Sequence, residues 1–243
     1  MKEYRNYIFD LYGTLIDIHT DESDMRFWRA FRDVLSTYGL DYSADELRSE
    51  YFSKVSQLEA EYAIKGHHIE IDIHDVFEYL FKNKGCSVSE EIIKETAIEF
   101  RKLSTTHIRL YAHVEELLNE LRKRDKHIYL FSNAQSLFTI YELKKLGLYD
   151  YFDDIFISSD IGYKKPDELF LLKLIDKHKL DKDECLLIGN DLNSDISCAS
   201  KCGVDSYYIK TKLSSKENKN IHPTYHQNGM DIRLLSKKLL TNH

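Results

Sequence analysis

Residues 4–15, with the sequence YRNYIFDLYGTL, decide the fold. Residues 4–9 are rich in aromatic side chains and include Ile8, a composition that predicts a short β-strand. Asp10 follows directly, and Gly13 supplies the freedom for a tight turn. The stretch therefore predicts a carboxylate that lies just beyond the end of a strand.

The second half of the chain repeats this pattern of a strand followed by a polar loop. Short apolar segments predict strands at residues 127–131, 155–157, 185–188 and 206–209. Helices are expected to begin at Ser136, Pro166 and Asn193, with a closing helix at residues 231–240. Strands that alternate with helices indicate βαβ units. The predicted fold class is therefore α/β, with a doubly wound parallel sheet.

A helical insertion separates the first strand from the later ones. Apolar residues recur there at three- and four-residue spacing, which predicts helices at 25–38, 44–64, 72–83 and 89–104. We therefore expect two domains, a core of residues 1–20 and 106–243 and a helical domain of residues 21–105. Ligands of doubly wound sheets bind beyond the carboxyl ends of the strands, so the core is where we expect the functional site.

The composition narrows the class of protein. With 243 residues, 42% of them hydrophobic and 31% charged, the chain can bury a sizeable core. A net charge of −7 and an isoelectric point near 5.9 disfavour a nucleic-acid-binding protein. No apolar run approaches the roughly 20 residues of a membrane-spanning helix. Four cysteines, and a start that leads straight into a strand, favour a reducing cytoplasm, and we expect a monomer or homodimer.

Polar side chains follow each of four predicted strands. Because the strands are parallel, their carboxyl ends meet at one edge of the sheet. The residue types combine a nucleophilic carboxylate, a hydroxyl and an amide for an anionic oxygen, a cation, and further carboxylates suited to a hard metal ion. They are Asp10, Tyr12 and Thr14, then Ser132 and Asn133, then Lys164 and Lys165, and finally Asn190, Asp191 and Asp195.

Four stretches resemble the haloacid dehalogenase superfamily of hydrolases, in the family's order. They are IFDLYGTL at residues 8–15, LFSN at 130–133, GYKKPD at 162–167 and LIGNDLNSD at 187–195. The resemblance runs from residue 8 to about residue 203, and the family's helical cap is inserted where residues 23–105 lie here. One such motif is weak evidence, whereas four in order, spaced by βα units, are specific.

The resemblance implies a role for each matching residue. Asp10 matches the nucleophile, which forms a covalent aspartyl intermediate that water then cleaves. Ser132 matches the residue that binds the substrate's anionic oxygen, with Asn133 beside it, and Lys165 matches the lysine that offsets negative charge around the nucleophile. Thr14 completes the catalytic candidates Asp10, Tyr12, Thr14, Ser132, Asn133 and Lys165.

The resemblance also implies a magnesium ion. Its acidic ligands come from the fourth motif, where Asp191 is the first choice and Asp195 the second, and the backbone carbonyl of Tyr12 contributes in the phosphatases. A shift of one residue in the loop would exchange Asn190 and Asp191. The expected ligand set is drawn from Asp10, Tyr12, Asn190, Asp191 and Asp195.

Two departures from the family's phosphatases keep alternatives open. Tyr12 stands where most of them have a second aspartate, and a phenol with a pKa near about 10 is a poor base at neutral pH. The 2-haloacid dehalogenases of the family do have tyrosine there, because halide leaves without a proton. Asn190 replaces the usual first aspartate of the fourth motif and brings no charge to a metal ion.

We expect a magnesium-dependent phosphatase of small phosphorylated metabolites, with a phosphate monoester as the small anionic substrate. One alternative is a metal-independent 2-haloacid dehalogenase. The dehalogenases of the family bind the substrate's carboxylate and halide with a Trp- and Arg-rich cap segment, which Arg26, Trp28, Arg29 and Arg32 resemble only weakly. The other is a binding or regulatory protein whose catalysis lapsed with the second aspartate.

Overall fold

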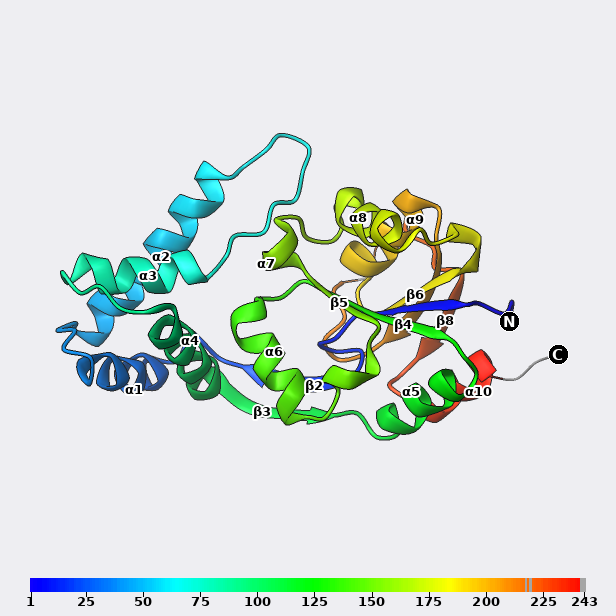
Figure 1. Cartoon of the computed structure of the whole chain (residues 1–243), viewed down its shortest axis with the longest axis horizontal. Helices are drawn as coiled ribbons and strands as arrows, with labels where there is room; N and C mark the ends of the chain where they lie inside the picture. Colours follow the sequence, from blue (N-terminus) through cyan, green and yellow to red (C-terminus); the bar gives the residue numbers. More distant parts are fainter. Residues whose placement is uncertain (217, 219, 241–243) are drawn as a thin grey trace.

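The computed structural model, which describes residues 1–216, 218 and 220–240, contains a six-stranded parallel sheet (Figure 1). The strand order is β5-β4-β1-β6-β7-β8, and every neighbouring pair is parallel. This confirms the predicted doubly wound α/β fold. The strands are β1 (Asn6–Phe9), β4 (His127–Ser132), β5 (Asp154–Ile157), β6 (Cys185–Gly189), β7 (Asp205–Lys210) and β8 (Tyr225–Asn228).

β1 lies at the centre of the sheet, between β4 and β6, and all four of its residues are buried. Successive side chains of a strand point to opposite faces. Tyr7 and Phe9 accordingly pack into the hydrophobic cluster on one face, and Ile8 packs into the cluster on the other. Asp10 follows this central strand, so the predicted nucleophile lies at the middle of the sheet's edge.

Helices cover both faces of the sheet (Figure 1). α5 (Val114–Lys123) and α10 (Ile232–Leu240) pack on the face of Tyr7 and Phe9, and α8 (Glu168–His178) and α9 (Ser197–Cys202) pack on the face of Ile8. α6 (Ser136–Lys145) and the short α7 (Ser158–Ile161) follow β4 and β5. Among the residues with described positions, no helix has the length and apolar composition needed to cross a membrane.

The helical insertion forms a hydrophobic cluster of its own, at one end of the molecule (Figure 1). Trp28, Phe31, Phe77 and Phe100 are fully or almost fully buried in it and contact one another edge to face. All four predicted helices are present, with ends that differ from the prediction by a few residues. They are α1 (Met25–Ser36), α2 (Ala44–Glu61), α3 (His74–Asn83) and α4 (Glu90–Ser104).

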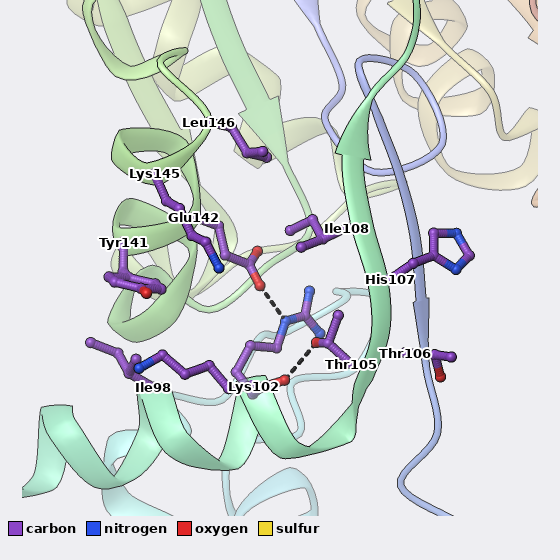
Figure 2. Close-up of a pocket in the computed structure, with 11 residues that line it drawn as sticks. Ile98, Lys102, Thr105, Thr106, His107, Ile108, Tyr141, Glu142, Lys145 and Leu146 are labelled. Carbon is purple, nitrogen blue, oxygen red and sulfur yellow. Dashed lines mark hydrogen bonds and ion pairs between the residues drawn. The ribbon is translucent and has the colours of Figure 1, made fainter.

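Three strands lie outside the predicted set. β2 (Ile16–Thr20) and β3 (Thr105–Leu110) form an antiparallel pair that joins the core to the insertion, where the prediction had only connecting segments. Figure 2 shows β3 leading out of α4 beside α6. β8 extends the sheet beyond β7. Its sequence is YHQN, whose polar residues lack the apolar pattern from which strands are predicted.

The helix expected at Asn193 begins differently. A π-helical turn, Leu192–Ile196, precedes the short α9. Asp191 stands at its start, and its Oδ1 accepts from the N–H groups of Asn193 and Ser194 at 2.8 and 2.9 Å. Turns of this kind are uncommon and recur at functional sites. This one turns Asp195 back toward the loop after β6, where its Oδ2 accepts from the Asp191 N–H.

Candidate active site

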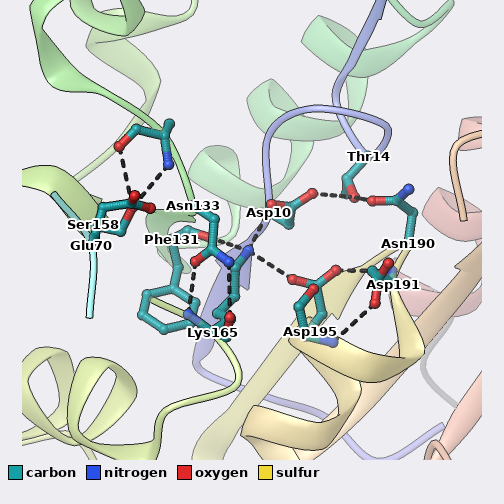
Figure 3. Close-up of polar contacts among 12 residues, drawn as sticks. Asp10, Thr14, Glu70, Phe131, Asn133, Ser158, Lys165, Asn190, Asp191 and Asp195 are labelled. Atoms are coloured by element: carbon teal, nitrogen blue, oxygen red, sulfur yellow. Dashed lines mark hydrogen bonds and ion pairs between the residues drawn. The ribbon is translucent and has the colours of Figure 1, made fainter. Parts of the chain in front are cut away.

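The four predicted polar loops meet around Asp10 (Figure 3). The Asp10 N–H donates to the carbonyl of Ile188 on β6 at 2.9 Å, which fixes the loop after β1 against its neighbour. Its Oδ2 accepts from the Thr14 hydroxyl at 2.9 Å. A pocket of about 180 Å³ opens here, lined by Asp10, Tyr12, Ser132, Asn133, Lys165, Asn190, Asp191, Ser194, Asp195 and Leu213.

Lys165 is the buried cation of this pocket. Its Nζ lies 2.7 Å from both Asp10 Oδ1 and Asp195 Oδ1, and it donates to the Phe131 carbonyl at 2.9 Å. Burial acts to lower the pKa of Lys165, but the attraction of Asp10 and Asp195 outweighs it and holds that pKa above its usual value. The side chain therefore carries a fixed positive charge beside the predicted nucleophile.

The sequence left open which of two adjacent lysines points inward. Lys165 is 4% exposed and reaches Asp10. Lys164 lies half-buried on the other side of the loop, with its Nζ 3.6 Å from Glu70. Asn133 holds this loop in place, because its Oδ1 accepts from the Lys165 N–H at 2.7 Å and its Nδ2 donates to the Lys165 carbonyl at 3.0 Å.

Ser132 ends β4 inside the pocket. Its side chain is buried, and its Oγ has no hydrogen-bond partner among the residues that the structure describes. A buried hydroxyl without a partner costs roughly 1–3 kcal/mol, so such groups are rare unless a ligand or water completes them. The Ser132 hydroxyl is therefore available to a ligand or water in the pocket.

The Asn190 amide completes a cluster of oxygens beside Asp10. Its Oδ1 lies 3.3 Å from both the Tyr12 carbonyl and Asp10 Oδ2, neither of which can donate to it. With the amide turned over, its Nδ2 would donate to the same two oxygens. Gly13 makes room for it, because it has a φ of +86° and a Cβ there would lie 2.5 Å from Asn190 Nδ2.

With the amide oxygen of Asn190 pointing this way, its Oδ1, Asp10 Oδ2 and the Tyr12 carbonyl would form a set of three oxygens that suits a hard cation such as magnesium. Among the residues placed by the structure, no group of three His, Cys, Asp or Glu could hold a metal ion. A cation at this point would depend on the Asn190 amide and the Tyr12 carbonyl as well as on Asp10. The donor set fits magnesium, with one negative charge fewer than an aspartate at position 190 would give.

Asp191 and Asp195, the two carboxylates first chosen as metal ligands, have different surroundings. Asp191 lines the pocket and caps the π-helical turn through Oδ1. Asp195 is 1% exposed and is paired with Lys165, and a Cβ on Gly189 would lie only 2.3 Å from its Oδ2. Burial raises the pKa of Asp195, and Lys165 opposes that shift.

Tyr12 lines the pocket, but its hydroxyl is hydrogen-bonded to residues of α6. That hydroxyl donates to Glu142 and lies 3.0 Å from the Thr139 Oγ1. Arg101, from α4 of the insertion, places its guanidinium 5.2 Å from the centre of the Tyr12 ring and pairs with Glu142 at 2.7 Å. Burial raises the pKa of Tyr12 above that of a free phenol, which makes its hydroxyl a weaker acid and keeps it protonated at neutral pH.

The sequence did not indicate Arg101, Thr139 or Glu142. They lie within helices, where a charged or hydroxyl side chain is usually solvent-exposed, and no short spacing links them to Tyr12. Along the chain, Tyr12 lies 127 residues from Thr139 and 130 residues from Glu142, and Arg101 lies 41 residues from Glu142. Only the folded structure brings them together.

A loop of the insertion, residues 67–73, also touches the core near the pocket. Its Glu70 accepts from the Ser158 hydroxyl at 2.9 Å (Figure 3). The His68 N–H donates to Asp167 at 2.8 Å, and the Gln135 side chain bonds to Ile71 and Ile73 backbone atoms. We call residues 67–73 the docking loop.

The chain is similar to known proteins of one family. The model of the haloacid dehalogenase-like hydrolase family matches residues 7–209. Glyceraldehyde 3-phosphate phosphatase of Methanothermobacter thermautotrophicus is 20% identical over 138 residues, which are 57% of this chain and 59% of that protein. Phosphoglycolate phosphatase of Vibrio vulnificus is 34% identical over 98 residues, 40% of this chain and 42% of that protein. The chain thus spans about half the length of these two relatives.

Solved structures share the whole architecture. The phosphatase of this family from Thermococcus onnurineus has a TM-score of 0.61 at 19% identity, covering 97% of this chain and 98% of that one. YfnB of Bacillus subtilis, solved with bound magnesium, has a TM-score of 0.59 at 20% identity, covering 99% and 100%. At such identities the likeness shows the fold. The family match over most of the length, together with four motif loops around Asp10, establishes that the chain belongs to the haloacid dehalogenase-like hydrolases.

Proposed function

We propose that this hydrolase is a magnesium-dependent phosphatase of small phosphate monoesters, with Asp10 as its nucleophile. The proposal rests on three chemical groups that lie together in the pocket of Asp10. A carboxylate, a buried ammonium and a partnerless hydroxyl, from Asp10, Lys165 and Ser132, face the same space of about 180 Å³. That space suits a phosphate group better than a large ligand.

In the proposed reaction, a carboxylate oxygen of Asp10 attacks phosphorus and forms an aspartyl phosphate. The bond from phosphorus to the ester oxygen breaks, and that oxygen leaves with the electron pair as an alkoxide or phenolate, which takes up a proton from water. Lys165 offsets the added negative charge, and the Ser132 hydroxyl donates to a phosphate oxygen. Water then attacks the phosphorus of the aspartyl phosphate, which releases inorganic phosphate and restores the Asp10 carboxylate.

Asp10 Oδ2, the Tyr12 carbonyl and Asn190 Oδ1 are the atoms that would hold magnesium. When bound, magnesium supplies positive charge that offsets the charge of the phosphate. Asp195 would act through Lys165, which it holds in place. The magnesium in the YfnB structure supports this assignment for a protein of the same fold.

Among the described residues that line the pocket, none offers a free acid for the leaving group. The Tyr12 hydroxyl is bound to Glu142, Asp195 is paired with Lys165, and Asp191 caps a helical turn. General acid catalysis is typically worth roughly a hundred- to ten-thousandfold. We therefore expect substrates whose leaving group needs little protonation to react fastest. The names of the relatives, which include two phosphatases of small metabolites, support the substrate size.

A 2-haloacid dehalogenase has less support from the insertion. Trp28 is fully buried and its indole N–H donates to the Glu22 carbonyl. Arg26 and Arg32 pair with the neighbouring Asp24 and Asp33 and do not line the pocket of Asp10. Halide release from a 2-haloacid in EDTA would nevertheless favour it over the phosphatase.

We also propose a cytoplasmic location. All four cysteines are free thiols, as expected in a reducing compartment. The same cysteines offer no support for a secreted, disulfide-stabilised protein.

The aspartyl phosphate provides the direct test of Asp10. The protein is mixed with an aryl phosphate, quenched in acid and reduced with borohydride, which converts a phosphorylated aspartate into homoserine. Peptide mass spectrometry should find homoserine at position 10 in the wild type and none in Asp10→Asn. Phosphate release without this product, or with it at another aspartate, would exclude the proposed nucleophile.

A further inference from the structure

The junction between the helical insertion and the core holds a second pocket. Its volume is about 270 Å³, and it shares no lining residue with the pocket of Asp10. Figure 2 shows α4 and β3 on one side and α6 on the other. The pocket is therefore formed jointly by the insertion and the core.

This junction pocket carries excess positive charge. Arg101, Lys102 and Lys145 line it, and Glu142 is the one carboxylate among its described lining residues. Glu142 is already paired with Arg101, with side chains that are 6% and 14% exposed. The charges of Arg101 and Glu142 offset each other, so Lys102 and Lys145 supply the excess positive charge of the pocket.

Both lysines are exposed, and neither is held by a buried carboxylate among the described residues. Lys102 lies 2.7 Å from Glu99, but both side chains are more than two-fifths exposed, so water screens that pair and it is easily exchanged. Lys145 lies 6.0 Å from the centre of the Tyr141 ring, and no ion pair joins it to any residue described by the structure. Neither ammonium is neutralised by a buried carboxylate.

We propose that the junction pocket binds a small organic anion. A phosphate or carboxylate group would lie between Lys102 and Lys145, since lysine ammoniums bind such groups as point charges. The apolar part would pack against Ile98 and Ile108, which line the same pocket. This proposal is independent of the reaction that Asp10 performs.

A ligand at this place would influence the active site. It contacts the Arg101 and Glu142 pair, and Glu142 holds the hydroxyl of Tyr12, two residues after Asp10. It also contacts both sides of the junction, so it would stabilise this placement of α4 against α6. An anion bound in the junction pocket would thus lie next to the contact that holds the Tyr12 hydroxyl.

The test uses the full chain with labelled isoleucine methyl groups, in EDTA. It is titrated with inorganic phosphate and, separately, with citrate, and the methyl signals of Ile98 and Ile108 are followed by NMR. We expect both signals to shift and saturate with at least one probe. The Lys102→Gln, Lys145→Gln double variant should weaken that binding about tenfold.

A matched control removes two other exposed lysines, as Lys123→Gln with Lys144→Gln, whose ammoniums contact Glu120 and the Tyr149 ring. It makes the same change in net charge and should leave the affinity unchanged. The proposal is overturned if neither methyl signal moves with either probe. It is also overturned if the control weakens binding as much as the double variant, which would indicate general surface attraction.

Discussion

At the scale of single residues, the site depends on one lysine shared by two carboxylates. Lys165 contacts Asp10 and Asp195 at 2.7 Å each, and Asn133 fixes its backbone from both sides. The geometry places a nucleophile and its counter-charge in contact before any substrate arrives. Such preorganisation is costly to lose, because each partner is buried.

Lys165→Met should strongly destabilise the protein. It leaves Asp10 and Asp195 buried without their cation, which costs about 3–5 kcal/mol. Urea unfolding measures the free energy of unfolding. Lys164→Met is the matched control, since the half-buried Lys164 lies 3.6 Å from the single carboxylate of Glu70, and it should cost clearly less than Lys165→Met. Equal losses in the two variants would contradict the assigned orientations.

Asn190→Asp should strengthen magnesium binding. It adds a negative charge at the atom that lies 3.3 Å from Asp10 Oδ2 and the Tyr12 carbonyl. Ligand charge sets cation affinity, so the magnesium concentration that gives half-maximal activity should fall about tenfold. In EDTA the same variant should unfold at lower urea, because two carboxylates then repel each other. An unchanged magnesium dependence would place the ion elsewhere.

At the scale of elements, the docking loop is held by Asp167, which is the N-cap residue of α8. Asp167 is 4% exposed and accepts from the N–H groups of His68 and Leu169 at 2.8 and 3.0 Å and pairs with His67 at 3.0 Å. Burial acts to raise the pKa of Asp167, but these donors together lower it below the ordinary value. A segment of the insertion and a helix of the core thus share one carboxylate.

Asp167→Asn should therefore destabilise the protein in a pH-dependent way. A depressed pKa in the folded state stabilises the protein above the unfolded pKa, near about 3.9, and this contribution disappears as the pH falls through the folded value. The variant should lose about 1–3 kcal/mol at neutral pH, as expected for hydrogen bonds to a charged group. The difference from wild type should shrink below about pH 4. A difference that stays constant with pH would contradict this account.

The elements also show how far the sequence predicts the structure. The four insertion helices and the strands around Asp10 follow from periodicity and from the loops after each strand, so their positions were predicted to within a few residues. The β2–β3 pair depends on contacts between residues about ninety positions apart, and β8 consists of polar residues at the edge of the sheet. Local pattern carries no signal for such pairings.

The site was predictable to a similar degree. Parallel topology placed Asp10, Ser132 and Lys165 on one edge, and the structure brings them together. The sequence does not predict which of the two lysines points inward, or which residue binds the Tyr12 hydroxyl, because both depend on the directions of side chains. Those directions are set by packing between distant segments, as Glu142 on α6 and Arg101 on α4 show.

At the scale of the whole molecule, the α/β core and the helical insertion, each with its own hydrophobic packing, are joined by the β2–β3 pair and by polar contacts across the junction. The Arg101 to Glu142 pair and the docking loop lie on different sides of that junction, and each reaches a residue beside the pocket. Movement of the insertion would therefore alter both the Tyr12 contact and the docking loop. The arrangement links the placement of the helices to the chemistry at Asp10.

The most direct measurement is the turnover of an activated aryl phosphate, 4-nitrophenyl phosphate, by wild type and by Asp10→Asn, in magnesium and in EDTA. The leaving group needs no acid, so the state of Tyr12 does not limit the rate. We predict phenolate release that requires magnesium, returns when magnesium is restored, and falls at least about a thousandfold in Asp10→Asn. Full turnover by that variant, or turnover that persists in EDTA, would contradict a magnesium-dependent phosphatase acting through Asp10.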